Sequence, residues 1–221
     1  MTRPRINDGI QQPTRTADRI DVTIPSWGDS GGDHANYAAF GSTGSTDRTE
    51  LRRNGALLAA GSSGLTSTVP ATRSAYRLTH TATRDATAEF PYSTATRTEW
   101  AFTSALPSTP DRPEQLPLVQ LDYTLPTDED GRAARDATLL VTPLHLTGGP
   151  RAALRTRKVE LSYDDGATWT TAGLGSRGGG RVATVLNAPA SARYVTLRVH
   201  AGDSRGNTVT QTVVRAAGIA R

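Results

Sequence analysis

Short runs in which apolar and polar residues alternate constrain the fold of this chain more than any other feature of its sequence. Ile20, Val22 and Ile24 alternate with polar residues, and Trp100 and Phe102 do so further along. A period of two places apolar side chains on one face of a β-strand, whereas an amphipathic helix needs a period near 3.6. Because helical periodicity is nearly absent, the sequence predicts an all-β protein.

Turn residues between these runs predict β-hairpins. Asn54 and Gly55 separate two strand-like runs, and an Asn-Gly pair supplies the positive φ angles of a type I′ turn. In the second half of the chain, residues 164–166 read Asp-Asp-Gly between runs at 158–163 and 167–171. Asn54 and Gly55 are therefore predicted as structural turn residues, and a second hairpin is expected around residues 164–166.

A proline-rich stretch at residues 106–116 predicts a boundary in the middle of the chain. Proline removes a backbone donor and fixes φ, so such a stretch favours an extended linker over a sheet. About seven strand-like runs follow it, the usual number for an immunoglobulin-like sandwich. We therefore expect two tandem immunoglobulin- or fibronectin-III-like β-sandwich domains. The expected division is a flexible segment at 1–17, a first domain at 18–105, the linker at 106–116 and a second domain at 117–221.

The composition excludes several classes of site. None of the 221 residues is cysteine, which excludes disulfides, thiol nucleophiles and thiolate metal sites. No apolar run approaches the roughly 18 residues that cross a bilayer, so no membrane span is predicted. Residues 1–16 are polar and lack the apolar stretch of a secretory signal, so no signal peptide is expected within the chain.

The charge balance is basic but does not predict a nucleic-acid partner. The chain has 25 Lys and Arg against 21 Asp and Glu, a net charge of +4. A basic balance favours anionic partners in general. However, the arginines are scattered, and the densest group, at residues 151–158, has no interleaved aromatic residues on which bases could stack. An ordinary solvated surface is the simpler interpretation.

Residues 28–32 read Gly-Asp-Ser-Gly-Gly, the nucleophile motif of trypsin-like serine peptidases. In that chemistry the serine needs a histidine base, and glycines let backbone amides point at the oxyanion. None of the 29 residues before Ser30 is histidine, and His34 is too near in sequence to reproduce the arrangement. The nucleophile and histidine segments of a subtilisin-type site are also missing. No catalytic residue is predicted, and the chain is expected not to be an enzyme.

The histidines and the acidic turn predict no cofactor and no metal site. His34, His80, His145 and His200 do not fall at i,i+2 or i,i+4 spacing, and strand packing is expected for His80 and His200. Residues 128–131 read Asp-Glu-Asp-Gly, which offers oxygen ligands but lacks the longer ordered series of an EF-hand loop. We expect a solvated turn there.

Residues 162–169 match Ser-x-Asp-x-Gly-x-Thr-Trp, the Asp-box hairpin of sialidases and related β-proteins. In this motif the aspartate accepts backbone amides in the turn, the glycine takes a left-handed angle and the tryptophan packs beneath the hairpin. Asp164, Gly166 and Trp169 are therefore predicted as structural turn residues. The motif occurs once in the chain, so it indicates a structural clip far more strongly than carbohydrate binding.

Three segments of the second half form a recognisable series. They read LPLVQLDYTLP at 116–126, VELSYDDGATW at 159–169 and VTLRVHAGDSRGNTVTQTVV at 195–214. In this order they are similar to the C-terminal region of long actinobacterial subtilisin-like (S8) serine peptidases. The first half, from 19–25 to 98–104, resembles the module just before that region. In that family these modules follow the catalytic domain and carry no catalytic residues. The resemblance implies a non-catalytic, secreted β-sandwich tail whose partner is an upstream peptidase catalytic domain.

Two functions remain open from the sequence. One is an accessory region of a secreted peptidase that stabilises it, spaces it or docks protein substrate or a cell-surface glycan. The other is a stand-alone extracellular protein that binds carbohydrate or protein. For the second, Trp27 and Tyr37 beside the glycine-rich loop at 26–45 are candidate ligand-stacking residues, since amphipathic rings suit such faces. Packing within the fold is the alternative role for both rings.

Overall fold

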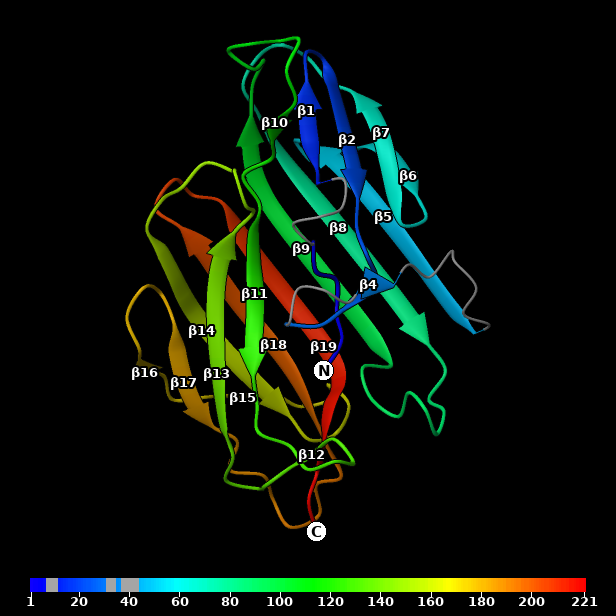
Figure 1. The fold of residues 1–221 in the computed structure, drawn as a ribbon, viewed down its shortest axis with the longest axis vertical. Helices are drawn as coiled ribbons and strands as arrows, with labels where there is room; N and C mark the ends of the chain where they lie inside the picture. Colours follow the sequence, from blue (N-terminus) through cyan, green and yellow to red (C-terminus); the bar gives the residue numbers. More distant parts are fainter. Residues whose placement is uncertain (7–11, 31–34, 37–43) are drawn as a thin grey trace.

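A long antiparallel sheet, here called the large sheet, runs through both halves of the sequence (Figure 1). The computed structural model describes residues 1–6, 12–30, 35–36 and 44–221, and these residues form strands and no helix. The strands of the large sheet are β5 (Ser45–Arg53), β6 (Ala56–Gly61), β8 (Ser74–Arg84), β9 (Ala95–Ser104), β12 (Arg132–Ala133), β14 (Leu154–Ser162), β15 (Thr170–Thr171), β18 (Tyr194–Asp203) and β19 (Thr208–Ile219). Their order across the sheet is β15-β14-β18-β19-β9-β8-β5-β6, with β12 parallel to β19.

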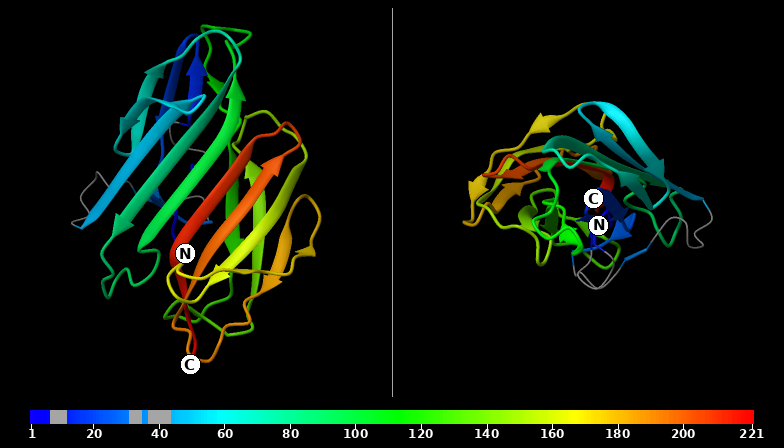
Figure 2. Two further views of the ribbon diagram at one scale, coloured as in Figure 1. Left: turned by 180° about the vertical axis from the view of Figure 1, so that it is seen from behind. Right: turned by 90° about the horizontal axis from the view of Figure 1, so that it is seen from above.

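Smaller antiparallel sheets cover one face of the large sheet. The first small sheet has the order β10-β1-β2-β7 and the second has the order β11-β13-β17-β16. Their strands are β1 (Thr14–Thr16), β2 (Arg19–Thr23), β7 (Gly64–Thr68), β10 (Glu114–Gln115), β11 (Val119–Thr124), β13 (Thr138–His145), β16 (Gly175–Ser176) and β17 (Val182–Val185). A short pair, β3 (Trp27–Gly28) and β4 (Ala35–Asn36), lies on the same side. Figure 2 shows the layered, sandwich-like arrangement from above. Among the described residues there is no helix that could span a membrane.

The period of two in the sequence decides which side chains face the small sheets. Along β9, Thr98, Trp100 and Phe102 are buried, whereas Arg97 and Glu99 point to the opposite face. The Trp100 indole N–H donates to the carbonyl of Val119 at 2.8 Å, which ties β9 to the start of β11. The core therefore lies between the large sheet and its covering sheets.

The two tandem sandwich domains expected from the sequence are not confirmed. Strand β9 belongs to the expected first domain and β19 to the second, yet they pair from Ala95 opposite Val214 to Ala101 opposite Thr208. The large sheet therefore crosses the expected boundary. The alternating pattern predicts where strands form, but it holds no information on which distant strand becomes the neighbour.

The expected linker at 106–116 and flexible segment at 1–17 both contribute to the fold. Strand β10 lies within the first and pairs with β1 in the second. Leu116, which directly follows β10, is buried, and its amide donates to the carbonyl of Pro13 at 3.0 Å. The prolines block hydrogen bonding only at their own positions, so Glu114 and Gln115 between them remain free to pair.

Residues 1–6 run inside the molecule rather than over its surface. Arg3 forms a β-bridge with Gly28, and its fully buried guanidinium donates to the carbonyl of Leu121 at 2.9 Å and to the Asp122 carboxylate at 2.5 Å. Arg5 also binds Asp122, at 2.8 Å. Residues 1–6 of the expected flexible segment are therefore anchored, because Arg3 and Arg5 bind β11.

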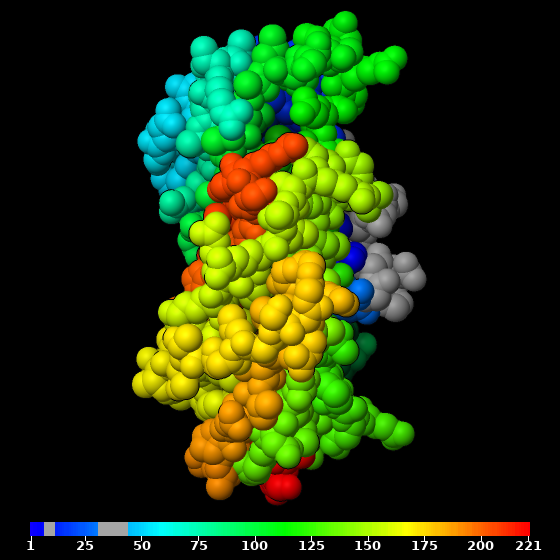
Figure 3. Space-filling view, turned by 90° about the vertical axis from the view of Figure 1, so that its left-hand side faces the viewer, coloured from blue at the N-terminus to red at the C-terminus, as the bar shows by residue number. Residues whose placement is uncertain are grey.

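One side of the molecule is formed mainly by the second half of the chain. In the space-filling view of Figure 3, the region from β13 to β17 and its connections (yellow-green to orange) makes up most of the visible surface. The turn between β18 and β19 (red-orange) lies against it near the top of the same view.

Candidate functional site

A buried cluster brings a serine, a histidine and an aspartate together beneath β5 and β8. The Ser26 hydroxyl donates to Asp47 Oδ2 at 2.7 Å and lies 3.2 Å from His80 Nε2. His80 Nδ1 lies 2.9 Å from the Thr49 hydroxyl. Ser26, Thr49 and His80 are all fully buried.

The donor and acceptor roles in these hydrogen bonds decide which atoms of the cluster carry protons. Because Ser26 gives its proton to Asp47, its oxygen accepts from His80 Nε2–H, and His80 Nδ1 accepts from Thr49. Burial lowers the pKa of His80 to about 4, even though the nearby Asp47 charge opposes this, so the ring is neutral near pH 7. Burial alone would raise the pKa of Asp47, but hydroxyls from Ser62, Ser63 and Ser26 outweigh it and lower that pKa.

The order of the hydrogen bonds in this cluster differs from that in a catalytic triad. In a triad the histidine stands between the carboxylate and the serine and takes the serine proton. Here Ser26 stands in the middle, and its proton points at Asp47. The described contacts give these residues a role in holding β5, β8 and the chain before β3 together.

Ser30 of the Gly-Asp-Ser-Gly-Gly sequence also has a structural partner. Its hydroxyl donates to the carbonyl of Tyr123 and accepts from the amide of Tyr123, both at 3.0 Å. The serine thus pairs with the edge of β11 as a backbone group would. Gly31, Gly32 and His34 lie outside the described residues.

The candidate stacking residues do not form an open aromatic surface in the described structure. Trp27 is only 5% exposed, its indole N–H donates to the Ser45 hydroxyl at 3.0 Å, and the Arg84 guanidinium covers its ring at 4.4 Å. Trp27 therefore packs inside the fold, which is the alternative role considered for it. Tyr37 lies outside the described residues.

The Asp-box hairpin after β14 is held by side-chain hydrogen bonds. Asp164 accepts from the amide of Thr168 at 2.9 Å and from its hydroxyl at 2.6 Å, and Ser162 also donates to Asp164 at 2.6 Å. These hydrogen bonds lower the pKa of Asp164 to about 2, and the bond from the Ser162 hydroxyl has the largest effect. Gly166 has a φ of 95° and lies against the ring of Trp169.

The other predicted turn lies at the opposite edge of the large sheet. Asn54 and Gly55 join β5 to β6 with φ angles of 48° and 89°, the positive pair that a type I′ turn needs. Since β6 and β15 are at opposite ends of the strand order, the structure does not bring the predicted turn residues together.

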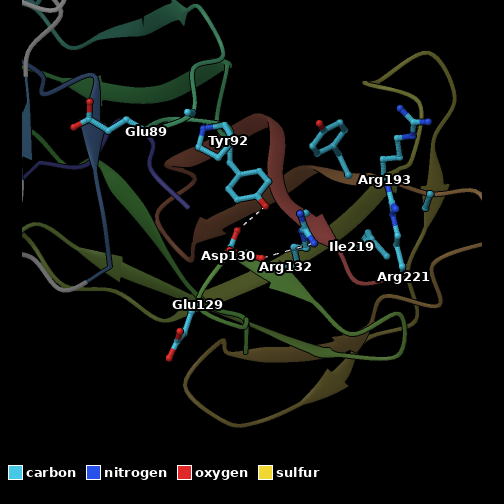
Figure 4. Close-up of a pocket in the computed structure, with 14 residues that line it drawn as sticks. Glu89, Tyr92, Glu129, Asp130, Arg132, Arg193, Ile219 and Arg221 are labelled. Carbon is cyan, nitrogen blue, oxygen red and sulfur yellow. Dashed lines mark hydrogen bonds and ion pairs between the residues drawn. The ribbon is translucent and has the colours of Figure 1, made fainter.

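A groove of about 660 Å³ lies where β12, β18 and the end of β19 meet the segment before β9 (Figure 4). Tyr92 forms one wall, and its hydroxyl donates to the carbonyl of Asp130 at 2.7 Å. Its ring meets that of Tyr194 edge-on, with 6.3 Å between the centroids. Figure 4 shows Tyr92, Asp130 and Arg132 converging, whereas Glu129 extends away from them.

Two glycines seat Tyr92 in this groove. A Cβ on Gly131, whose φ is 72°, would come within 2.6 Å of the Tyr92 ring, and a Cβ on Gly218 would come within 2.6 Å of its hydroxyl. The Tyr92 ring can therefore occupy this position only because residues 131 and 218 have no side chain. Residues 128–131 form an exposed turn, as expected, and Glu129, Asp130 and Gly131 of this turn also line the groove. Nothing local in the sequence links Tyr92 to either glycine, so the sequence could not reveal the groove.

The groove is polar and carries both signs of charge. Its charged lining residues are Glu89, Glu129, Asp130, Arg132, Arg193 and Arg221. Such a lining suits a polar ligand better than an apolar one. Among the described residues, no three His, Asp or Glu side chains gather in a way that could hold a metal ion.

No protein-family model matches the chain, and no curated protein matches it. The resemblance to the tail of subtilisin-like peptidases therefore remains a sequence-based expectation.

Proposed function

We propose that this chain is a non-catalytic accessory region of a secreted subtilisin-like serine peptidase, which it stabilises and spaces. The observation that carries the proposal is the large sheet, because it joins both halves of the chain through β9 and β19. Two domains on a flexible linker would change their relative position, but strands of one sheet do not. A body of this kind suits a spacer.

Contacts of the reactive side chains also support an accessory role. The described hydrogen bonds of Ser26, Ser30 and His80 connect these side chains to neighbouring strands and segments and so stabilise the fold. The segments at 116–126 and 195–214, which resemble the peptidase tail, form β11 and most of β18 and β19. The third resembling segment, at 159–169, forms the end of β14 and the hairpin at the edge of the large sheet.

The test starts from the secreted proteins of the producing organism. Antibodies against this chain should capture a polypeptide much longer than 221 residues that reacts with a fluorophosphonate, a reagent for active serines. The purified 221-residue chain should not react. Capture of an unreactive native polypeptide near 23.4 kDa would overturn the proposal and favour the stand-alone binding protein. Reaction of the purified chain that Ser30→Ala abolishes would indicate an enzyme instead.

The spacer role has a separate physical test. Because the large sheet is shared, calorimetry of the purified chain should show one unfolding transition whose calorimetric and van't Hoff enthalpies agree. Two resolved transitions, one for each half, would contradict a single rigid unit.

A further inference from the structure

The outward face of the large sheet carries an ordered row of arginines and threonines. The register places Arg48, Thr81, Arg97, Thr212 and Arg198 side by side on β5, β8, β9, β19 and β18. Each alternates along its strand with buried residues, so each points away from the core. The view from behind in Figure 2 shows these strands side by side, with no other described strand lying across them.

The spacing of the arginines in this row is regular. Neighbouring strands lie about 4.8 Å apart, so an arginine on every second strand recurs at about 9.6 Å. The side chains of Arg48 and Arg97 are 57% and 56% exposed, and that of Arg198 is 32% exposed. The row therefore presents accessible cations at a fixed interval, with a threonine hydroxyl between each pair.

A glutamate holds each arginine in place. Arg48 binds Glu50 at 2.8 Å, Arg97 binds Glu99 at 3.1 Å and Arg198 binds Glu160 at 2.7 Å. A guanidinium has five N–H donors, and these contacts use only one or two of them. The remaining donors are available to a second anion, and the side chain has already lost much of its freedom.

Each glutamate also binds a second cation, so the face keeps an excess of positive charge. Arg52 lies 3.2 Å from Glu50, Arg77 lies 3.3 Å from Glu99 and Lys158 lies 2.6 Å from Glu160. Each group of two cations and one carboxylate therefore has a net positive charge.

The Asp-box hairpin supplies an aromatic ring at one end of the row. The Arg198 guanidinium lies 4.1 Å from the centre of the Trp169 ring. This cation–π contact restricts the Arg198 side chain further, so the ring acts on the row through the arginine. Cations, hydroxyls and one ring thus share a single face.

We propose that this row binds an extended anionic polysaccharide whose carboxylates are spaced by about two strand widths. The arginines pair with the carboxylates, and the threonines hydrogen-bond the sugar hydroxyls between them. Duplex nucleic acid fits less well, because each of its strands carries a phosphate about every 3.4 Å of helix axis and most would face threonine or glutamate. No aromatic residue lies between the arginines on which a base could stack. This inference holds whether or not the chain is joined to a peptidase.

The probe is hyaluronan, which carries one carboxylate per disaccharide, and the measurement is its affinity for the purified chain at low salt. The triple variant Arg48→Gln, Arg97→Gln and Arg198→Gln should bind about 10-fold or more weakly. The matched control removes the same charge from loops through Arg112→Gln, Arg151→Gln and Arg181→Gln, and should change the affinity less than about 2-fold. Unchanged melting temperatures would show that both variants fold.

A second variant keeps every charge. Replacing Thr81 and Thr212 with valine retains strand propensity and shape, and should weaken hyaluronan binding while leaving the salt dependence unchanged. Equal losses in the arginine row and the loop control would overturn the proposal, as would failure of the wild-type chain to bind hyaluronan. Tighter binding of single-stranded DNA than of hyaluronan at the same salt concentration would also overturn it and favour nucleic acid.

Discussion

One part of the interior, beneath the middle of β5 and β8, is polar, whereas the part in the same register row beneath β14 and β18 is apolar. One register row of the large sheet passes through both regions and reads, from β5 to β14, Thr49, His80, Thr98, Gln211, Val199 and Val159. All six residues are buried. The change in chemistry occurs at β19, where the Gln211 amide donates to Thr98 at 2.8 Å and to the carbonyl of Pro4 at 3.2 Å.

The difference follows from what covers each region. The apolar region is covered by β11, β13 and β17, which pair with one another so that most of their backbone groups have partners within this sheet. The polar region is crossed by residues 1–6, whose backbone groups need other partners, such as the Gln120 side chain for the amide of Ile6 at 2.7 Å. A sheet-covered core can be apolar, whereas a core crossed by an irregular segment needs polar side chains.

Removing the arginine that anchors the irregular segment should have the largest effect. Arg3→Ala leaves Asp122 and the carbonyl of Leu121 short of donors, and the free energy of unfolding should fall by about 3–5 kcal/mol. Urea denaturation measures it. The control is Arg19→Ala, which removes an exposed pair with Asp21 and should cost less than about 1 kcal/mol. Similar losses for both variants would show that burial of Arg3 has no special importance.

The apolar region should respond through cavity formation instead. Leu197 on β18 is fully buried, and Leu197→Ala should lower the free energy of unfolding by about 2–5 kcal/mol at every pH between 4 and 8. Leu57→Ala, at a residue 47% exposed, should change it by less than about 0.5 kcal/mol. A loss that depends on pH would show that the two regions are not chemically separate.

Acid should weaken the polar region first. Because the pKa of His80 is about 4 in the folded protein against 6.5 for an ordinary histidine, only the unfolded chain binds this proton between those values. Stability should therefore be complete above pH 6.5 and fall by roughly 3 kcal/mol on acidification to pH 4. Denaturation across this range should show that His80→Gln loses the slope, whereas His200→Gln on the outward face keeps it. An unchanged slope in His80→Gln would assign the pH dependence to other groups.

The smallest effect is expected at the Asp-box hairpin on the sheet edge. Asp164→Ala removes the acceptor for the amide and hydroxyl of Thr168, so the melting temperature should fall. Asp164→Asn keeps one acceptor oxygen and should fall less. Asp136→Ala, at an exposed position, is the control. A melting temperature unchanged by Asp164→Ala would mean that the hairpin does not depend on this side chain.

The local alternation of apolar and polar residues predicted where strands form. It could not predict which distant strands pair or which distant side chains bind one another. The alternation of Tyr76, Leu78 and His80 does place all three on the inner face of β8. The pairing of β9 with β19 depends on the packing of the whole sheet, which no local window contains. Arg3 looked like a solvated residue near a chain end because its partner Asp122 is more than 100 residues away.

The candidate sites show the same division. The turn at residues 164–166 is a local structure, and its sequence specifies it through side chains two to four residues apart. The groove around Tyr92 joins segments that are far apart, with Gly131 and Gly218 each shaping the space for one ring. Trp27 lies in β3 and is buried. The glycine-rich sequence around it predicts a loop and gives no sign of this burial.

The place of β19 between β18 and β9 has a consequence for synthesis of the chain. Strand β9 ends at Ser104, but the strand that completes its open edge begins only at Thr208. A growing chain therefore exposes that edge while the intervening residues are added, and an open edge is where chains associate with one another. Pairing across such a separation is also slow. The large sheet can therefore be completed only after β19, its last strand in sequence, has been synthesised.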